Sequence, residues 1–227
     1  MPCVVFETNL EEDVKNTTET VNFSIGGKNF GAGVEKEIVD IVKNSTKEEA
    51  TAIVTRKMSE YYEKNKEIIR LKIKEFEKEW NPTNDRFFER LEKITGKSVC
   101  SQKFTACITT AGRCPYNPKK FWFMVSLFNP PEQVKTTIAH EILHMQVINN
   151  YEKMLPAIPS KLAWDVIEVL TFLLDEEFSD LLSKPDKGYP AHQELRNELL
   201  KEWRKDKDFE KFLPKAIEIT RNLSNDI

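Results

Sequence analysis

Two of the chain's three histidines stand one helical turn apart, and a glutamate directly follows the first of them, in the stretch TTIAHEILHMQVI. At about 100° per residue, a helix places His140 and His144 on one face. Both imidazoles can then reach one ion at the roughly 2.0–2.1 Å that zinc requires. Glu141 falls on the same side of the helix, close enough to act on a water molecule at the ion without binding the ion itself. The spacing therefore predicts a metal-binding helix.

Apolar residues flank this polar group along the predicted helix. They are Val134, Ile138, Ile142, Leu143, Met145 and Val147. Such a helix is buried nearly all round, except along the polar strip that contains His140, Glu141 and His144. Polar side chains in a buried helix need partners, and a metal ion supplies one. The alternative is a pair of core histidines whose ring nitrogens are satisfied by hydrogen bonds.

The motif HEILH resembles the HExxH signature of the zincin metallopeptidases. In that family, a helix that follows a small sheet supplies two zinc ligands and the glutamate that serves as general base. The resemblance implies that His140 and His144 bind Zn²⁺ and that Glu141 activates water for peptide hydrolysis. The extended zincin pattern HExxHxxGxxH is absent, because Val147 and Asn150 occupy its glycine and histidine positions. The resemblance is therefore to the gluzincins, the branch whose third ligand is a downstream glutamate.

Glu168 is the third ligand that the resemblance implies. It lies on a helix expected from Ser160 onward, and Trp164 and Phe172 stand one turn before and after it. Aromatic residues around a carboxylate are typical of a cleft wall rather than a solvent-exposed face. The alternative is that Glu168 simply faces water, as most glutamates do. The chain also departs from one gluzincin pattern, because Ile167 and Phe172 replace an asparagine before the ligand and an aspartate after it.

Several other residues remain candidates for the third ligand. They are Asp175, Glu176, Glu177 and His192. Asp175 could instead orient a ligand by hydrogen bonding. His192, the only other histidine, is also a candidate catalytic donor to the oxyanion of the tetrahedral intermediate, or a structural or exposed histidine. Tyr189 and Tyr151 are the other candidate donors, and the sequence does not choose among them.

The elements that would position these residues are mostly helical. Between Ser45 and Trp80 the chain has neither glycine nor proline, and apolar residues recur every three or four positions. We expect one long amphipathic helix there, ended by Asn81-Pro82. Asn129 is expected to cap the metal-binding helix, with Pro130 as its first residue. A shorter helix is expected to follow, through Phe87 and Phe88 to its end near Gly96. The remaining expected elements are strands at 103–111 and 121–128, helices at 130–150 and 160–184, and a C-terminal set of helices at 191–223.

These elements predict an α+β fold, mostly helical, in which a small antiparallel sheet has a long backing helix and precedes the metal-binding helix and the glutamate helix. This order is similar to that of the zincins, and the resemblance spans roughly residues 45–185. Residues 1–44 are expected to form a poorly defined N-terminal extension, with a strand at CVVF and a hairpin or loop at Gly26-Gly27. Residues 45–227 are expected to form a single metallopeptidase domain with C-terminal helices.

Composition disfavours several classes of function. The formal net charge is −3, with charged residues of both signs interspersed, so we expect neither a nucleic-acid partner nor an anionic membrane partner. No signal-peptide pattern and no long apolar run occurs, which favours a cytoplasmic location. The four cysteines, at positions 3, 100, 107 and 114, lack the paired spacing of a structural zinc site. We expect them to be ordinary reduced thiols in or near the sheet.

The sequence therefore predicts a zinc-dependent peptidase whose peptide or protein substrate lies extended along the strand at 121–128. An alternative is a metal-binding protein without peptidase activity, a regulatory or protein-interaction domain on a zincin-like scaffold. A third hypothesis is that the long helix at 45–80 docks to a partner. An open coordination position favours catalysis, because a fourth protein ligand closes a structural zinc site. The substrate, the oligomeric state and an inhibitory role of residues 1–44 are left open.

Overall fold

A four-stranded sheet forms the centre of the computed structural model, which describes residues 1–155 and 158–225. Its strand order is β1-β4-β6-β5. The strands are β1 (Cys3–Thr8), β4 (Lys103–Thr109), β5 (Tyr116–Asn117) and β6 (Trp122–Ser126). β4 pairs in parallel with β1 and β6, and β5 pairs antiparallel with β6. The α+β class is confirmed, and most of the chain is helical. The prediction of an antiparallel sheet is wrong, because β4 runs parallel to both of its neighbours. The link from β4 to β6 contains β5 and crosses over, so that β6 runs in the same direction as β4.

The N-terminal residues belong to this sheet. The strand expected at CVVF is β1, which pairs with β4 along its whole length (Cys3 with Lys103 to Thr8 with Ile108). Helix α1 (Leu10–Thr20) then packs against β4. Its buried Asp13 accepts hydrogen bonds from the Thr110 backbone N–H at 2.9 Å and the Tyr62 hydroxyl at 2.8 Å. The division of the chain at residue 44 stays a prediction, and the pairing of β1 with β4 argues that the two parts depend on each other.

The long helix expected at 45–80 is two helices, α3 (Lys47–Lys64) and α4 (Lys66–Thr95). The break is at Asn65, whose side-chain amide donates to the Tyr61 carbonyl at 2.8 Å. The predicted stop at Asn81-Pro82 is wrong, because α4 continues through Pro82. A proline inside a helix costs about 3 kcal/mol. The fully buried rings of Phe87 and Phe88, at about 1.5–3 kcal/mol each, offset that cost.

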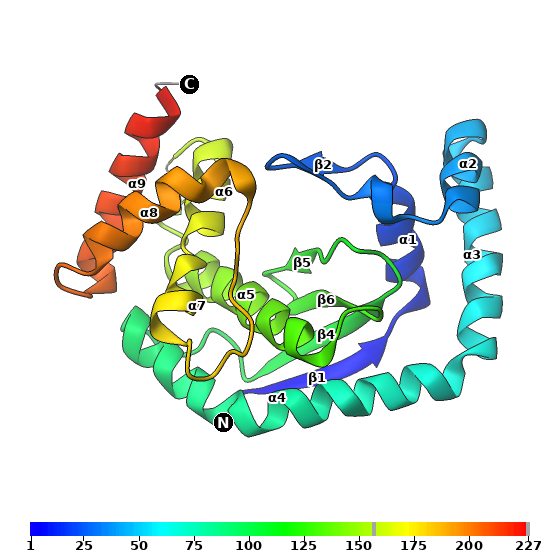
Figure 1. Ribbon diagram of the computed structural model, residues 1–227, viewed down its shortest axis with the longest axis horizontal. Coiled ribbons are helices and arrows are strands. Elements are labelled where there is room, and N and C mark those ends of the chain that lie inside the picture. The colour runs from blue at the N-terminus through cyan, green and yellow to red at the C-terminus, as the bar shows by residue number, and fades with distance from the viewer. Residues whose placement is uncertain (156–157, 226–227) are drawn as a thin grey trace.

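Figure 1 shows α4 running along one side of the molecule, with α5 (Pro131–Asn150) across its middle. Helix α5 packs against β6, α4 and α6. It begins one residue later than expected, since Pro131 is its first residue. Asn129 does not cap it, because Pro130 is the N-cap residue and this helix end has no side-chain cap hydrogen bond.

The chain after α5 forms shorter helices than expected. The predicted helix at 160–184 is α6 (Ser160–Val169) and α7 (Phe172–Glu177), which a turn at Leu170-Thr171 separates. A 3-10 turn at Pro190–His192 precedes α8 (Gln193–Trp203), and α9 (Phe209–Asn225) follows. Both C-terminal helices pack against α6. The core cluster extends over these helices and the sheet without interruption.

A small hairpin leaves the α1 side of the molecule and points toward α6 in Figure 1. Its strands are β2 (Ser24–Ile25) and β3 (Lys28–Asn29), which confirms the turn expected at Gly26-Gly27. Gly26 has a φ of 58°, and a Cβ atom there would come within 2.6 Å of the Tyr189 ring. Only glycine fits this contact. A short 3-10 turn (Gly31–Gly33) and helix α2 (Lys36–Asn44) follow.

All four cysteines are free thiols, as expected; Cys3 and Cys107 lie in β1 and β4. Within residues 1–155 and 158–225, none of the helices has both the length and the apolar composition needed to cross a membrane.

Candidate metal centre

Helix α5 brings the three residues of the HExxH motif together. The rings of His140 and His144 have their centroids 4.3 Å apart. Each of His140, Glu141 and His144 offers a ligand atom, and these three atoms lie within 4.8 Å of one another. The structure therefore contains a His-Glu-x-x-His arrangement that can bind a metal, as the spacing predicted.

Several polar atoms at this cluster are buried without a hydrogen-bond partner. They are Oε2 of Glu141 and both ring nitrogens of His144. Leaving one such buried group unpaired costs about 1–3 kcal/mol. A metal ion at Nε2 of His144 would remove part of this cost, so the donor set fits a bound cation.

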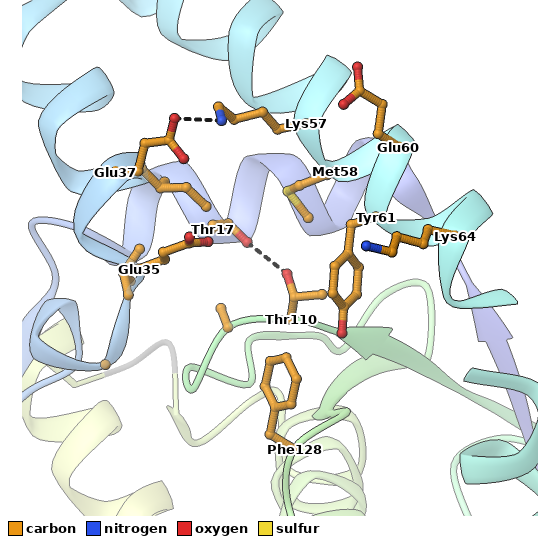
Figure 2. A pocket seen from close by; sticks show the side chains of 14 residues that line it. Thr17, Glu35, Glu37, Lys57, Met58, Glu60, Tyr61, Lys64, Thr110 and Phe128 are labelled. Carbon is orange, nitrogen blue, oxygen red and sulfur yellow. Dashed lines mark hydrogen bonds and ion pairs between the residues drawn. The ribbon is translucent and has the colours of Figure 1, made fainter. Parts of the chain in front are cut away.

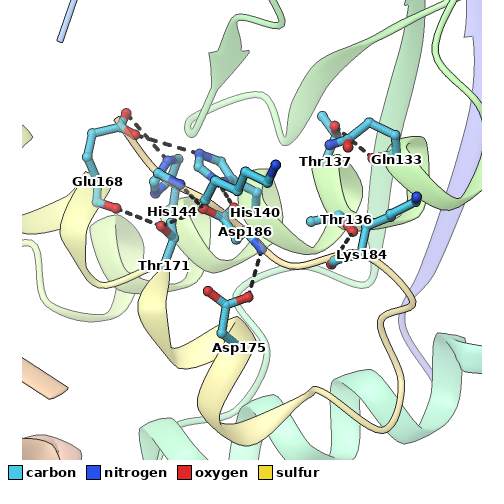
Figure 3. Close-up of polar contacts among 12 residues, drawn as sticks. Gln133, Thr136, Thr137, His140, His144, Glu168, Thr171, Asp175, Lys184 and Asp186 are labelled. Carbon is cyan, nitrogen blue, oxygen red and sulfur yellow. Dashed lines mark hydrogen bonds and ion pairs between the residues drawn. The ribbon is translucent and has the colours of Figure 1, made fainter. Parts of the chain in front are cut away.

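Helix α6 adds Glu168 to the two histidines (Figure 3). One carboxylate oxygen lies 3.7 Å from His140 Nε2, and the other lies 3.5 Å from His144 Nε2. The ligand atoms of a tetrahedral zinc site at 2.0–2.1 Å are separated by roughly 3.3 Å. Each carboxylate oxygen thus approaches a different histidine, while the group whose ligand atoms all lie within 4.8 Å of one another consists of His140, Glu141 and His144. Glu168 is buried and does not face water.

Asp186 orients His140 from the opposite side of the ring. Its Oδ2 atom lies 2.5 Å from His140 Nδ1, and its Oδ1 atom accepts from the Thr171 hydroxyl at 3.2 Å and the Gly188 backbone N–H at 3.0 Å. A carboxylate on Nδ1 fixes the ring and leaves Nε2 free for a metal. The sequence reasoning missed Asp186. Its only signal is a carboxylate in the proline- and glycine-containing loop KPDKGYP.

Asp175 was the residue expected to orient a ligand, and the structure places it one step further away. It accepts from the Asp186 backbone N–H at 2.7 Å and pairs with Arg196 at 3.0 Å. The buried guanidinium of Arg196 also donates to the Thr171 hydroxyl at 2.7 Å and to the Asp186 carbonyl at 2.5 Å. Arg196 on α8 therefore holds the loop that carries Asp186.

Electrostatics at the metal-free cluster follow from these contacts. Burial raises the pKa of Glu141 to about 8, and the charges of Glu168 and Asp186 act in the same direction. Burial disfavours a charged His140, but the Asp186 carboxylate raises the pKa of His140 well above its usual value. Burial and the His140 charge lower the pKa of His144. Despite its burial, the two histidines lower the pKa of Glu168. The carboxylate of Asp186 thus favours the protonated form of His140.

The cluster opens into a cavity of about 240 Å³ between α5, α6 and the hairpin. Phe23, Ile25 and Phe30 of the hairpin region line it on one side. The other walls are formed by Arg113, Cys114, Pro115, Tyr116, Trp164 and Tyr189. The Tyr116 ring lies against His144, with centroids 5.2 Å apart. A small or extended ligand in this cavity would touch both the metal-binding residues and the hairpin.

His192 is not brought to the cluster. Its Nε2 atom lies 3.1 Å from Asp165, and its ring contacts Trp164 and Tyr189. Although His192 is buried, it does not line the cavity that contains the HExxH residues. The catalytic role expected for it stays a prediction. Tyr151 is also excluded as a donor at the site, because its hydroxyl donates to the Thr95 carbonyl at 2.7 Å.

The remaining acidic candidates lie elsewhere. Glu176 pairs with Arg204 at 2.6 Å, and Glu177 accepts from the Trp203 indole at 2.7 Å. Phe172, expected beside Glu168 on the cleft wall, packs against Phe212 instead. Because a turn separates α6 from α7, Phe172 does not continue the helix face that carries Glu168. Trp164 does line the cavity with Glu168, as expected.

The strand that borders this cavity is β5 and not β6. β6 has β4 on one side and β5 on the other, so its backbone is not free to pair with a substrate at Trp122 and Phe123. β5 therefore covers β6 at these two residues, and the expectation that substrate lies along 121–128 stays a prediction. β5 is the last strand of the sheet, and its Tyr116 lines the cavity.

Within residues 1–155 and 158–225, no group of three histidine, cysteine, aspartate or glutamate side chains other than His140, Glu141 and His144 has its ligand atoms this close together. Cys114 lines the cavity but does not join this group.

No family model, curated protein or solved structure matches this chain. The metal-binding arrangement therefore rests on its own geometry, and this geometry does not identify the metal.

Proposed function

We propose that the protein is a zinc-dependent peptidase of the gluzincin type, with His140, His144 and Glu168 as the zinc ligands. One observation carries the proposal: two histidine Nε2 atoms and a buried carboxylate converge, while Glu141 beside them keeps a buried oxygen without a partner. A structural site does not need that glutamate. A peptidase site does need it as a general base, and a general base must keep a lone pair free to accept a proton.

Zinc at this position supplies two kinds of chemistry: it lowers the pKa of a water molecule toward 7, and it polarises the carbonyl of the bond to be cleaved. Glu141 accepts a proton from the attacking water on its unpartnered Oε2 atom and passes it to the nitrogen of the leaving amine. Asp186 keeps His140 in the ring orientation that presents Nε2 to the ion.

Tyr189 is the residue that we assign to the oxyanion. It lines the cavity with Glu141 and Glu168. Burial, together with the charges of those carboxylates, raises the pKa of its phenol, so the phenol keeps its proton and can donate a hydrogen bond. The other two candidates, His192 and Tyr151, lie outside the cavity.

The substrate binds as an extended peptide along the free side of β5. Backbone pairing at a sheet edge supplies affinity without demanding a particular sequence. Because β5 ends the sheet and its Tyr116 lines the cavity with the HExxH residues, a peptide added there reaches that cavity. The hairpin at 24–29 covers the cavity from the other side, which favours a single extended segment over a folded domain.

The test is the Glu141→Gln variant, with Glu132→Gln on the first turn of the same helix as the matched control. We expect Glu141→Gln to retain zinc and to hydrolyse casein about 10²–10⁴ times more slowly, because only proton transfer is lost. Glu132→Gln should behave as wild type. Equal hydrolysis by Glu141→Gln and wild type would exclude this mechanism. Zinc binding without hydrolysis in wild type would favour the non-peptidase alternative.

A further inference from the structure

A second cavity, of about 510 Å³, lies beyond the metal centre between helices α1, α2 and α3 and the segment after β4 (Figure 2). Its apolar lining consists of Val34, Ile38, Met58, Tyr61, Ala111 and Phe128. The side chain of Phe128 is 65% exposed. In Figure 2 its ring points into the same space as the ring of Tyr61. The ring of Phe128 is therefore available for apolar contact with a ligand in this cavity.

This cavity adjoins the metal centre along two segments of the chain. Ala111 and Phe128 line the second cavity, whereas Gly112, Cys114 and Asn129 line the hollow that also contains His140 and Glu141. An extended chain spans at most about 3.3–3.6 Å per residue. The three steps from Ala111 to Cys114 therefore cover at most about 11 Å. An extended substrate needs three or four residues to cross the same distance.

The direction of β5 indicates which end of a substrate reaches this cavity. The chain runs from Ala111 past Cys114 to β5 at Tyr116–Asn117. A peptide that pairs antiparallel with β5 runs the opposite way, so its carboxyl-terminal part points back toward Ala111. Residues after the bond to be cleaved are therefore the ones that approach Phe128.

The charges at the rim do not select a charged ligand. Glu37 pairs with Lys57 at 2.6 Å, and Glu35, Glu60 and Lys64 also line the cavity, so both signs are present. The buried side chain of Met58 and the exposed ring of Phe128 offer apolar contact instead. The charges at the rim therefore select no particular ligand charge. The preference for a ligand comes mostly from the apolar surface of the cavity.

We propose that this second cavity is a substrate subsite that binds a large apolar side chain three or four residues on the carboxyl side of the cleaved bond. The inference rests on the proposed peptidase function and names its substrate class: extended peptides with leucine or phenylalanine at those positions. The subsite is built by α1, α2, α3 and the segments after β4 and β6, and none of its lining residues belongs to the HExxH group.

The experiment uses three synthetic peptides that share one cleavage site, taken from the products of casein digestion. The short peptide ends two residues after the cleaved bond. The long peptide continues for five residues, with leucine and phenylalanine at the third and fourth positions. The third peptide has the full length but carries glycine at those two positions. We expect kcat/KM for the long peptide to exceed that of both others by about 10- to 100-fold, as for other apolar side chains in a pocket.

Two variants change the cavity from different sides. Phe128→Ala removes an exposed ring, and Leu71→Ala on α4, 53% exposed and distant in sequence, is its control. Gly33 lines the cavity, and a Cβ there meets nothing within 4 Å, so Gly33→Trp adds a large side chain at the cavity wall. Gly33→Ala is its control. We expect both cavity variants to lose the advantage of the long peptide, while both controls keep it.

The outcomes separate this inference from the proposed function. If wild type cleaves the three peptides equally, or if Phe128→Ala and Gly33→Trp keep the advantage of the long peptide, the subsite is refuted while the peptidase function stands. If wild type cleaves neither the peptides nor casein, both proposals fail. Thermal melting of each variant shows whether a lost advantage reflects the cavity, since a folded variant melts like wild type.

Discussion

The Nδ1 atom of His140 lies 2.5 Å from a carboxylate oxygen of Asp186, which is 46 residues further along the chain. This contact joins the metal-binding helix to a loop that no local pattern connects with it. Thr171, Gly188 and Arg196 in turn hold Asp186 or its backbone. The orientation of one proposed zinc ligand thus depends on side chains from α8 and from the loops that flank α7.

Replacing Asp186 by asparagine should weaken zinc binding without abolishing it. The amide can still contact His140, but it lacks the charge that increases the basicity of the ring. We expect the zinc dissociation constant to rise about 10- to 100-fold. Competition with a chromophoric chelator measures this constant. Asp180→Asn, which alters an exposed ion pair with Arg90, is the control and should bind zinc as wild type does. An unchanged dissociation constant in Asp186→Asn would remove the role given to this contact.

Zinc affinity should increase with pH from 6 to 8. The Asp186 carboxylate raises the pKa of His140 in the metal-free protein, so a proton must leave His140 before zinc binds. Burial and the His140 charge lower the pKa of His144, so a proton on His144 contributes less to this dependence than the proton on His140. Below the raised pKa of His140, each pH unit should change the dissociation constant by about tenfold. Chelator competition at several pH values checks this slope. A flat profile would contradict the assignment, and Asp186→Asn should shift the dependence to lower pH.

Helix α4 should contribute to stability through its buried face. Phe76 is 1% exposed, and its ring centroid lies 6.2 Å from that of Phe6 in β1. Phe76→Ala should lower the free energy of unfolding by about 3–5 kcal/mol, because it removes a buried ring and leaves a cavity. Urea denaturation followed by circular dichroism measures the change. Leu71→Ala, on the exposed face of the same helix, should change it by less than about 0.5 kcal/mol. Equal midpoints for the two variants would revive the hypothesis that this helix serves a binding partner.

The sequence predicts the local part of the site better than the long-range part. His140, Glu141 and His144 belong to one helix, so their spacing alone places them together. Glu168 lies on a separate helix, and its position came from a resemblance. Asp186 lies in a loop, where no periodicity indicates the direction of a side chain. His192 was one of the candidates for the third ligand, and the fold directs its ring to Asp165 instead.

The predictions of the fold that were wrong have similar causes. Strand patterns at 103–111 and 121–128 do not reveal whether the strands run parallel, and the two-residue strand β5 is too short to produce a pattern. The proline rule predicted a helix end at Pro82, where tertiary packing of Phe87 and Phe88 outweighs the local cost. Both cases show that contacts between distant residues override a local preference.

The central claim is that His140, His144 and Glu168 hold zinc together, and the zinc content of purified variants tests it most directly. Elemental analysis after zinc reconstitution and removal of free metal should give about one zinc per chain in wild type and in His192→Ala. It should give little or none in His140→Ala and clearly less than one in Glu168→Ala, because two histidines alone hold zinc weakly. Full zinc in Glu168→Ala together with loss of zinc in His192→Ala would contradict the ligand set, and wild type without zinc would contradict the account as a whole.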